Sequence, residues 1–259
     1  MANEPTDSIQ IYINSKHADV IIDATNSNCI YYLPYIKAST GHYIHLSLVN
    51  ATIPYSFYNI NQSNSILQYI QKDPITLAII SSVYIYIPYG NYNANQMVTW
   101  LNTNIPSLKT TYSTISNKFY MINTLGNIFL FNIAGGNCFE PLGLSATNQQ
   151  ANTSIVNELY SPNAINLATI RCINIVTNYN SGNVSILEEN NFTTLASVPV
   201  VAQPNSLIFY ENTNNFRSNL FIGEFNNISI RLTDQDGNKL DFNGQFYNMT
   251  LQIDILQFS

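Results

Sequence analysis

The sequence contains few charged side chains. They make up 9% of its 259 residues, against about 25% in ordinary globular proteins. The 9 Lys and Arg residues are outnumbered by 15 Asp and Glu residues, so the net charge is −6. Binding to a nucleic-acid backbone requires clustered cations, and so does attraction to an anionic membrane surface. We therefore expect neither nucleic acid nor a membrane among the partners.

Cysteine is also scarce. Cys29, Cys138 and Cys172 are odd in number and show no C-x-x-C spacing, which does not fit a disulfide framework or a structural zinc site. The first residues lack the basic and apolar regions of a signal peptide. No apolar run reaches the roughly 18 residues of a membrane helix. We expect a protein that folds in a reducing cytoplasm and does not insert into a membrane.

Histidine and acidic motifs provide little catalytic chemistry. His42 and His45 could ligate a metal, but their odd spacing in a strand places the rings on opposite faces. The run Asp234-x-Asp236-Gly-Asn238 is faintly similar to a calcium loop, yet its Gly comes too early and no final Glu follows. A hairpin turn explains this run fully. Cys172 lies in an apolar strand and is expected to be a small core residue.

The sequence offers two further arrangements of carboxylates and histidines. Glu188 and Glu189 are neighbours and face opposite ways on a strand, so they cannot act as a pair across one bond. A cupin-like oxygenase would need two histidines and a carboxylate to converge; the candidates are His17, His42, His45, Asp19 and Asp23. Phosphate loops, Gly-x-Ser-x-Gly and His-Glu-x-x-His motifs are absent from the sequence. We predict no enzymatic activity, and no catalytic, cofactor-binding or metal-binding residues.

The apolar residues that are present favour strands. They form 46% of the chain and are rich in Ile and Tyr, which are residues that suit strands. Alternation of apolar and polar residues predicts strands in several segments. The clearest of these are 9–13, 44–48, 83–87, 168–176, 228–232 and 249–255. Turn-forming residues separate them, and the pattern around residues 116–118 predicts a hairpin between residues 112 and 122.

One segment has helical spacing instead. Asn93 can cap a helix that runs to about Asn104. The apolar residues Met97, Trp100, Leu101 and Ile105 form one stripe of it, which places Trp100 in the core. A shorter helical turn is expected over residues 139–143, and residues 149–166 are expected to form a surface loop or a crossing between sheets.

These elements predict an all-β protein: an antiparallel jelly-roll sandwich with an inserted helix-plus-hairpin segment. We expect one jelly-roll domain over residues 8–259, with the insertion at roughly residues 90–135 and a possible flexible arm at residues 1–7. The 18 Tyr and 13 Phe residues imply a largely uncharged, aromatic surface. Such surfaces are typical of interfaces, although the codon bias of an AT-rich genome would also enrich Asn, Ile and Tyr.

The serial order of several segments resembles the jelly-roll penton (vertex) and minor capsid proteins of large icosahedral double-stranded DNA viruses. That group includes nucleocytoplasmic giant viruses, polinton-like viruses and virophages. In the family, Thr or Ser often follows the tyrosine at position 92, whereas this chain has Asn93, which can cap equally well. The segments that carry the resemblance are 45–61, 86–102, 112–122, 139–144, 228–244 and 249–253.

The resemblance implies a structural virion protein without catalytic residues. It implies a capsid location after assembly in the host cytoplasm, with major and minor capsid proteins as neighbours. The chain is short for two complete jelly rolls, so the role that suits it best is the penton, a homopentameric ring at the fivefold vertices. The alternatives are another minor capsid protein of the same shell, or a β-sandwich module that binds carbohydrate or a receptor. In that module Tyr side chains and Trp100 would stack on sugar rings.

Overall fold

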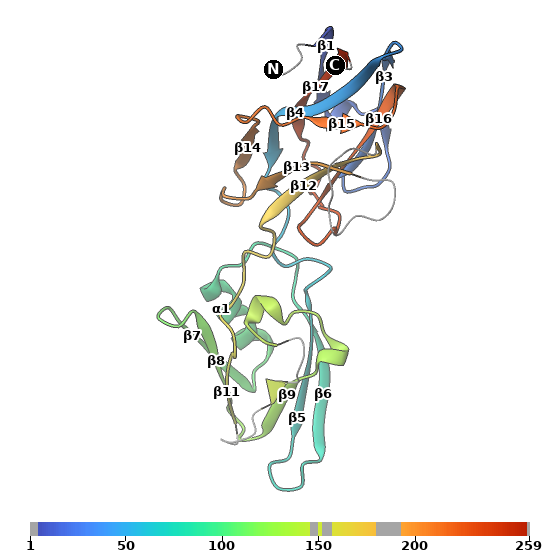
Figure 1. Cartoon of the computed structure of the whole chain (residues 1–259). Helices are drawn as coiled ribbons and strands as arrows, with labels where there is room; N and C mark the ends of the chain where they lie inside the picture. Colours follow the sequence, from blue (N-terminus) through green and yellow to red (C-terminus); the bar gives the residue numbers. More distant parts are fainter. Residues whose placement is uncertain (1–4, 146–149, 152–156, 180–192, 258–259) are drawn as a thin grey trace. The chain divides into compact units, whose positions relative to one another are not determined.

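The computed structural model describes residues 5–145, 150–151, 157–179 and 193–257. The chain divides into two compact units, and Figure 1 labels the helix and most of the strands. The discontinuous unit contains residues 1–57 and 170–259, and the inserted unit contains residues 58–169. The inserted unit begins earlier and ends later than the 90–135 segment that we predicted. Strands on both sides of that segment share one hydrophobic core with it, which explains the difference.

The discontinuous unit is an antiparallel sandwich of two sheets, as the alternating segments predicted. Its first sheet has the order β1-β17-β4-β14, and β15 also pairs with β4. The bounds are β1 (Asp7–Asn14), β17 (Asn248–Gln257), β4 (His42–Pro54), β14 (Leu207–Glu211) and β15 (Ser218–Leu220). The second sheet has the order β13-β12-β16-β3-β2. Its strands are β13 (Thr193–Pro199), β12 (Cys172–Thr177), β16 (Glu224–Thr233), β3 (Asn28–Lys37) and β2 (Val20–Ile21).

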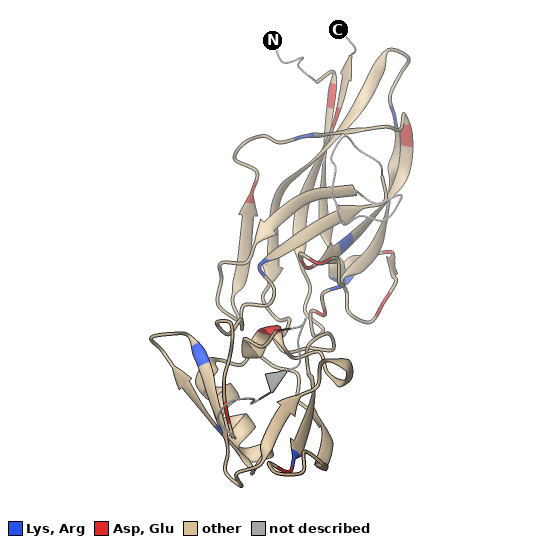
Figure 2. Ribbon diagram, turned by 60° about the horizontal axis from the view of Figure 1, so that its bottom comes forward, with Lys and Arg blue, Asp and Glu red and all other residues tan. Residues whose placement is uncertain are grey.

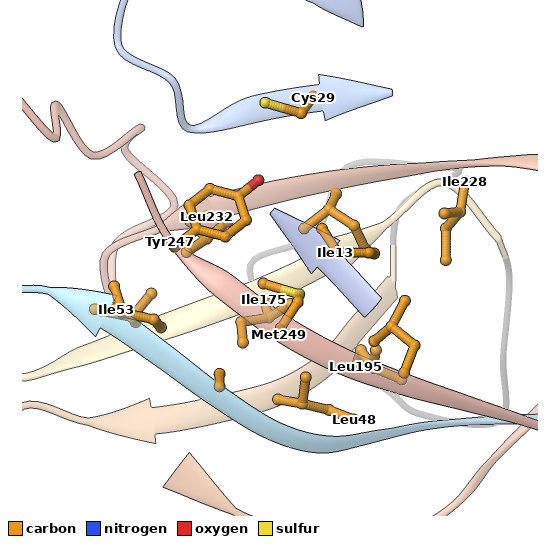
Figure 3. Packing of buried hydrophobic residues seen from close by; sticks show 14 of the residues in the cluster. Ile13, Cys29, Leu48, Ile53, Ile175, Leu195, Ile228, Leu232, Tyr247 and Met249 are labelled. Atoms are coloured by element: carbon orange, nitrogen blue, oxygen red, sulfur yellow. The ribbon is translucent and has the colours of Figure 1, made fainter. Parts of the chain in front are cut away.

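The core of this unit lies between the two sheets. Each long strand turns alternate apolar side chains inward, so the core draws on strands from both ends of the chain. Figure 3 shows Ile13, Leu48 and Met249 of the first sheet near Ile175 and Leu232 of the second. All these side chains are buried. Burial of this kind contributes most of the favourable free energy of folding.

The described residues of the inserted unit form two smaller sheets and one helix. One sheet has the order β10-β9-β5-β6, and the other has the order β11-β8-β7. The strands are β5 (Ile66–Lys72), β6 (Ile79–Tyr86), β7 (Leu108–Ser113), β8 (Lys118–Asn123), β9 (Ile128–Phe131), β10 (Gln150–Ala151) and β11 (Glu158–Tyr160). The pair β7–β8 is the predicted hairpin. Buried Phe119, Phe129 and Phe131 contribute aromatic rings to the core.

The helix α1 (Ala94–Asn104) begins where the sequence predicted. The Asn93 side chain accepts from the Gln96 backbone N–H at 2.9 Å, and the Gln96 side chain accepts from the Asn93 backbone N–H at 2.9 Å. This reciprocal capping box satisfies two backbone donors at the first turn. Three 3-10 turns complete the structure: η1 (Ser15–His17), η2 (Ile133–Gly135) and η3 (Glu140–Leu142). The last of them matches the turn predicted over residues 139–143.

The start of the chain is partly integrated into the sheet. Residues 1–4 of the predicted arm lie outside the described part of the chain. The Thr6 backbone N–H donates to the Ile255 carbonyl at 2.8 Å, and Asp7 already pairs with β17. An arm of residues 1–7 therefore cannot be free along its full length, because its last residues have sheet partners.

Candidate assembly surfaces

The three histidines do not come together. His17 is an exposed residue of the η1 turn, whereas His42 and His45 are both in β4. Alternation along β4 places His45 on the face opposite to the buried Ile44. Among the described residues, no group of three or more His, Cys, Asp or Glu side chains could hold a metal ion. Asp19 and Asp23 therefore form no such group with the histidines.

The acidic loop at Asp234 is a turn, as predicted. One carboxylate oxygen of Asp234 accepts from the backbone N–H groups of Asp236 at 2.9 Å and Asn238 at 2.8 Å. The other accepts from the Asn238 side chain at 3.0 Å. Gly237 has a φ of +82°, which glycine adopts without strain. The Asp234 carboxylate thus serves the turn itself.

Two of the three cysteines lie in the hydrophobic cores of the units. All three are free, and Cys29 and Cys138 are buried, whereas Cys172 is only half-buried. We expected Cys172 to be a core residue, but it is only partly buried. Its side chain lies on the face of β12 opposite to that of the buried Ile173. Burial raises the pKa of the Cys29 thiol and of the Cys138 thiol. A thiol with a raised pKa is a poor nucleophile at neutral pH. Glu188 and Glu189 lie outside the described residues.

The surface that remains is mostly uncharged. Figure 2 shows long stretches of ribbon without an acidic or basic residue, in both units. The longest such stretch is residues 74–108, which contains no Asp, Glu, Lys, Arg or His. None of the helices in the described part of the chain is long and apolar enough to cross a membrane. Exposed apolar side chains gather at several surfaces, and these are the candidate functional sites.

The first such surface is the β1 edge of the discontinuous unit. β1 is an outer strand of its sheet and pairs only with β17 among the described strands. Ile9 is 36% exposed on it and Tyr12 is 77% exposed. After β1 and η1, the chain forms β2, the outer strand of the second sheet, where Val20 and Ile21 are also exposed. Unpaired backbone groups beside exposed apolar side chains favour pairing with another chain.

The opposite side of the same sheet is the β14/β15 edge. β14 and β15 pair with different stretches of β4, along the side of β4 that β17 does not occupy. Phe209 of β14 is 73% exposed, and Phe216 and Phe221, which flank β15, are exposed as well. Leu207 adds a further apolar side chain. The first sheet therefore has apolar residues exposed at both of its edges.

A third surface is the β6 edge of the inserted unit. β6 is the outer strand of its sheet, and nearly all of its residues are exposed. Tyr84 and Tyr86 stand on the face opposite to the core, and Ile79 and Ile80 are exposed near the start of the strand. The turn before β6 exposes Ile75 as well. The strand lies inside the charge-free stretch 74–108, so no charged side chain protects this edge.

Sequence reasoning predicted the uncharged, aromatic surface but not its location. Exposure at an edge depends on which strands pair, and β1 pairs with β17 across the whole length of the chain. The helical spacing predicts Trp100 in the core, whereas the structure shows it half-buried, packed against the core and lining a surface hollow beside α1. The apolar stripe of α1 is centred on Met97 and Leu101, and Trp100 lies at its margin.

Comparison with known proteins gives a fold but no family. No family model and no curated protein matches the chain. The crystal structure of the mavirus penton protein is similar, with a TM-score of 0.52 and 14% identity, over 96% of this chain and 100% of the mavirus chain. A chain in the cryo-EM structure of the Sputnik virophage gives a TM-score of 0.46 and 14% identity, over 98% and 99%. The protein therefore has the jelly-roll fold of the mavirus penton protein, as the sequence resemblance implied.

Proposed function

We propose that the protein is a structural virion protein, and that it forms a homopentameric ring at the fivefold vertices of an icosahedral capsid. The observation that supports this most strongly is the pair of apolar edges on one sheet, the β1 edge and the β14/β15 edge. Their chemistry suits an interface, because aromatic residues are enriched and Lys and Glu depleted there. The mavirus protein that shares the fold is a penton protein.

We expect a ring because the two edges of the sheet expose different residues. The β1 edge presents Ile9 and Tyr12, whereas the β14/β15 edge presents a set of phenylalanines. Two unlike surfaces on opposite sides of one protomer make a heterologous contact, which closes into a ring when the rotation between copies allows it. Few charges then have to lose water when the edges meet, so the desolvation cost of assembly is low.

Mutation of each edge tests the proposal. We expect Phe209→Glu and Tyr12→Glu each to disperse the ring into monomers in light scattering and native mass spectrometry. Each variant buries a new charge at one edge and leaves the other edge intact. The matched control is Ile115→Glu, since Ile115 is 98% exposed in the hairpin of the inserted unit. The control is expected to keep the wild-type mass.

Mixing the two edge variants separates a heterologous contact from a symmetric one. The Phe209→Glu protein keeps its β1 edge and the Tyr12→Glu protein keeps its β14/β15 edge, so a mixture is expected to form one-to-one dimers and no rings. If each edge instead paired with itself, either variant alone would form a dimer through its intact edge. That outcome, or a wild-type protein that stays monomeric at high concentration, would contradict the proposed ring.

A further inference from the structure

A surface hollow runs along the outer side of α1 in the inserted unit. It is shallow and open to solvent, with a volume of about 490 Å³. Two aromatic residues line it, Tyr92 just before the helix and Trp100 in its middle. Four amide side chains and two hydroxyls complete the lining: Asn93, Asn95, Gln96, Asn104, Thr99 and Thr103. No residue of the lining is charged.

Several polar side chains of the hollow are held in place and still have hydrogen-bonding groups free. In the capping box, Asn93 and Gln96 use only their side-chain oxygens, so the NH₂ group of each amide stays a donor. The Thr99 hydroxyl donates to the Asn95 carbonyl at 2.9 Å, and its oxygen can still accept. The capping amides of Asn93 and Gln96 and the Thr99 hydroxyl are therefore held beside two aromatic rings, which lowers the entropy cost of binding at these groups.

This chemistry excludes most classes of ligand. A phosphate, a nucleic acid or an acidic sugar would need a cation, and residues 74–108 contain none. An apolar helix of a partner protein would leave the amides buried without hydrogen bonds, which is unfavourable. A neutral sugar matches both the aromatic and the polar residues of the lining. Its C–H face packs on an aromatic ring, and its hydroxyls form hydrogen bonds with the amide and hydroxyl side chains.

We propose that this hollow binds an uncharged glycan, with Trp100 and Tyr92 as the aromatic platform and the side chains of Asn93, Asn95 and Gln96 as hydrogen-bonding partners. The site lies on one helix of the inserted unit and does not depend on the capsid role. A protein that forms no ring could still bind the glycan, and a ring could form without it.

The chain provides its own reporter for this site. It contains a single tryptophan, and that residue is Trp100. We expect neutral oligosaccharides that score on a glycan array to change the tryptophan emission of the full-length protein in a saturable way. Sialylated and sulfated glycans are expected to give neither a score nor an emission change, because the hollow has no cation to pair with them.

Two variants keep the test independent of folding. Thr99 is exposed, so Thr99→Glu fills the hollow with a charged side chain and leaves the buried face of α1 untouched. It is expected to weaken binding by up to about tenfold, because the glutamate keeps the sugar from stacking on the rings and a stacked ring contributes on that scale. Leu125→Glu, at an exposed residue away from the lining, is the control and should bind as the wild type does. No neutral glycan bound, acidic glycans preferred, or binding that survives Thr99→Glu would each overturn the proposal.

Discussion

The carboxylate of Asp254 lies 3.2 Å from the guanidinium of Arg217, and Asp254 is almost completely buried. Asp254 is in β17, whereas Arg217 comes just before β15. The carboxylate also accepts from the Ser8 hydroxyl at 2.7 Å and from the Gln252 side chain at 2.8 Å. This cluster therefore ties β1, β17 and the segment before β15 together on the outer face of the sheet that carries both apolar edges.

Removal of the Arg217 side chain should destabilise the protein. Arg217→Ala leaves the buried Asp254 carboxylate without its cation, so we expect a loss of about 1–3 kcal/mol in the free energy of unfolding. The matched control is Lys37→Ala, because the Lys37–Glu224 pair at 3.3 Å is exposed on both sides. That control should change stability by less than about 1 kcal/mol. Urea unfolding measures both, and equal losses would contradict a structural role for the buried pair.

His45 next to this cluster should make stability depend on pH. Burial lowers the pKa of His45, the charge of Arg217 lowers it further, and Asp254 partly offsets the effect. The unfolded state then binds a proton more readily than the folded state, so the stabilising contribution is present above a pH of about 6.5 and is lost as the pH falls.

Comparison of the wild type with His45→Gln isolates this contribution from that of the acidic residues. We expect the variant to lose less stability than the wild type between pH 7 and pH 5, as measured by thermal melting. His17→Gln, at an exposed residue of η1, is the control and should follow the wild-type curve. Parallel curves for the wild type and His45→Gln would contradict the prediction.

Asn59 joins the beginning and the end of the inserted unit. Its side-chain NH₂ donates to the carbonyls of Tyr92 at 2.8 Å and Leu167 at 2.9 Å, and its side-chain oxygen accepts from the Tyr92 N–H at 2.9 Å. Asn59→Leu should therefore cost about 2 kcal/mol or more. The same substitution at the exposed Asn95 is the control.

The loss of stability caused by Asn59→Leu should be confined to the inserted unit. Tryptophan fluorescence follows unfolding of this unit, because the single Trp100 lies in α1. Hydrogen exchange should show faster exchange of the Tyr92 amide, since its acceptor is the Asn59 side chain. An unchanged exchange rate at Tyr92 would contradict the role given to Asn59.

The exposed edge of β6 should promote association of the isolated protein. Tyr84 faces away from the core, next to Gln68 of β5. Tyr84→Lys places a charge on an edge that has none, and edge lysines oppose strand pairing. We expect less light scattering in concentrated solution at an unchanged melting temperature. Equal scattering from the variant and the wild type would show that this edge does not promote association.

The sequence predicted local structure better than long-range pairing. The strands at residues 44–48, 228–232 and 249–255 were evident because alternation is a local pattern. The cap at Asn93 was evident for the same reason. In contrast, the extent of the inserted unit depends on contacts between distant segments, such as the one that Asn59 makes with Leu167. In a sequence so rich in asparagine, no local signal distinguishes Asn59 from its neighbours.

The positions of the candidate surfaces were likewise not predictable from the sequence. Composition indicated an uncharged exterior, and the structure places groups of exposed apolar residues at the β1, β14/β15 and β6 edges. Trp100 shows that a position in an apolar stripe of a helix does not by itself predict burial. Helical spacing places it next to Met97 and Leu101, but a residue at the margin of a stripe can still reach solvent, and here it lines a hollow.

Native mass spectrometry of the purified full-length chain tests the central claim most directly. The account predicts an assembly of five copies of the 29.1 kDa chain that is lost in Phe209→Glu and kept in Ile115→Glu. A protein that remains a single copy at every concentration, or an assembly that Phe209→Glu leaves unchanged, would contradict it.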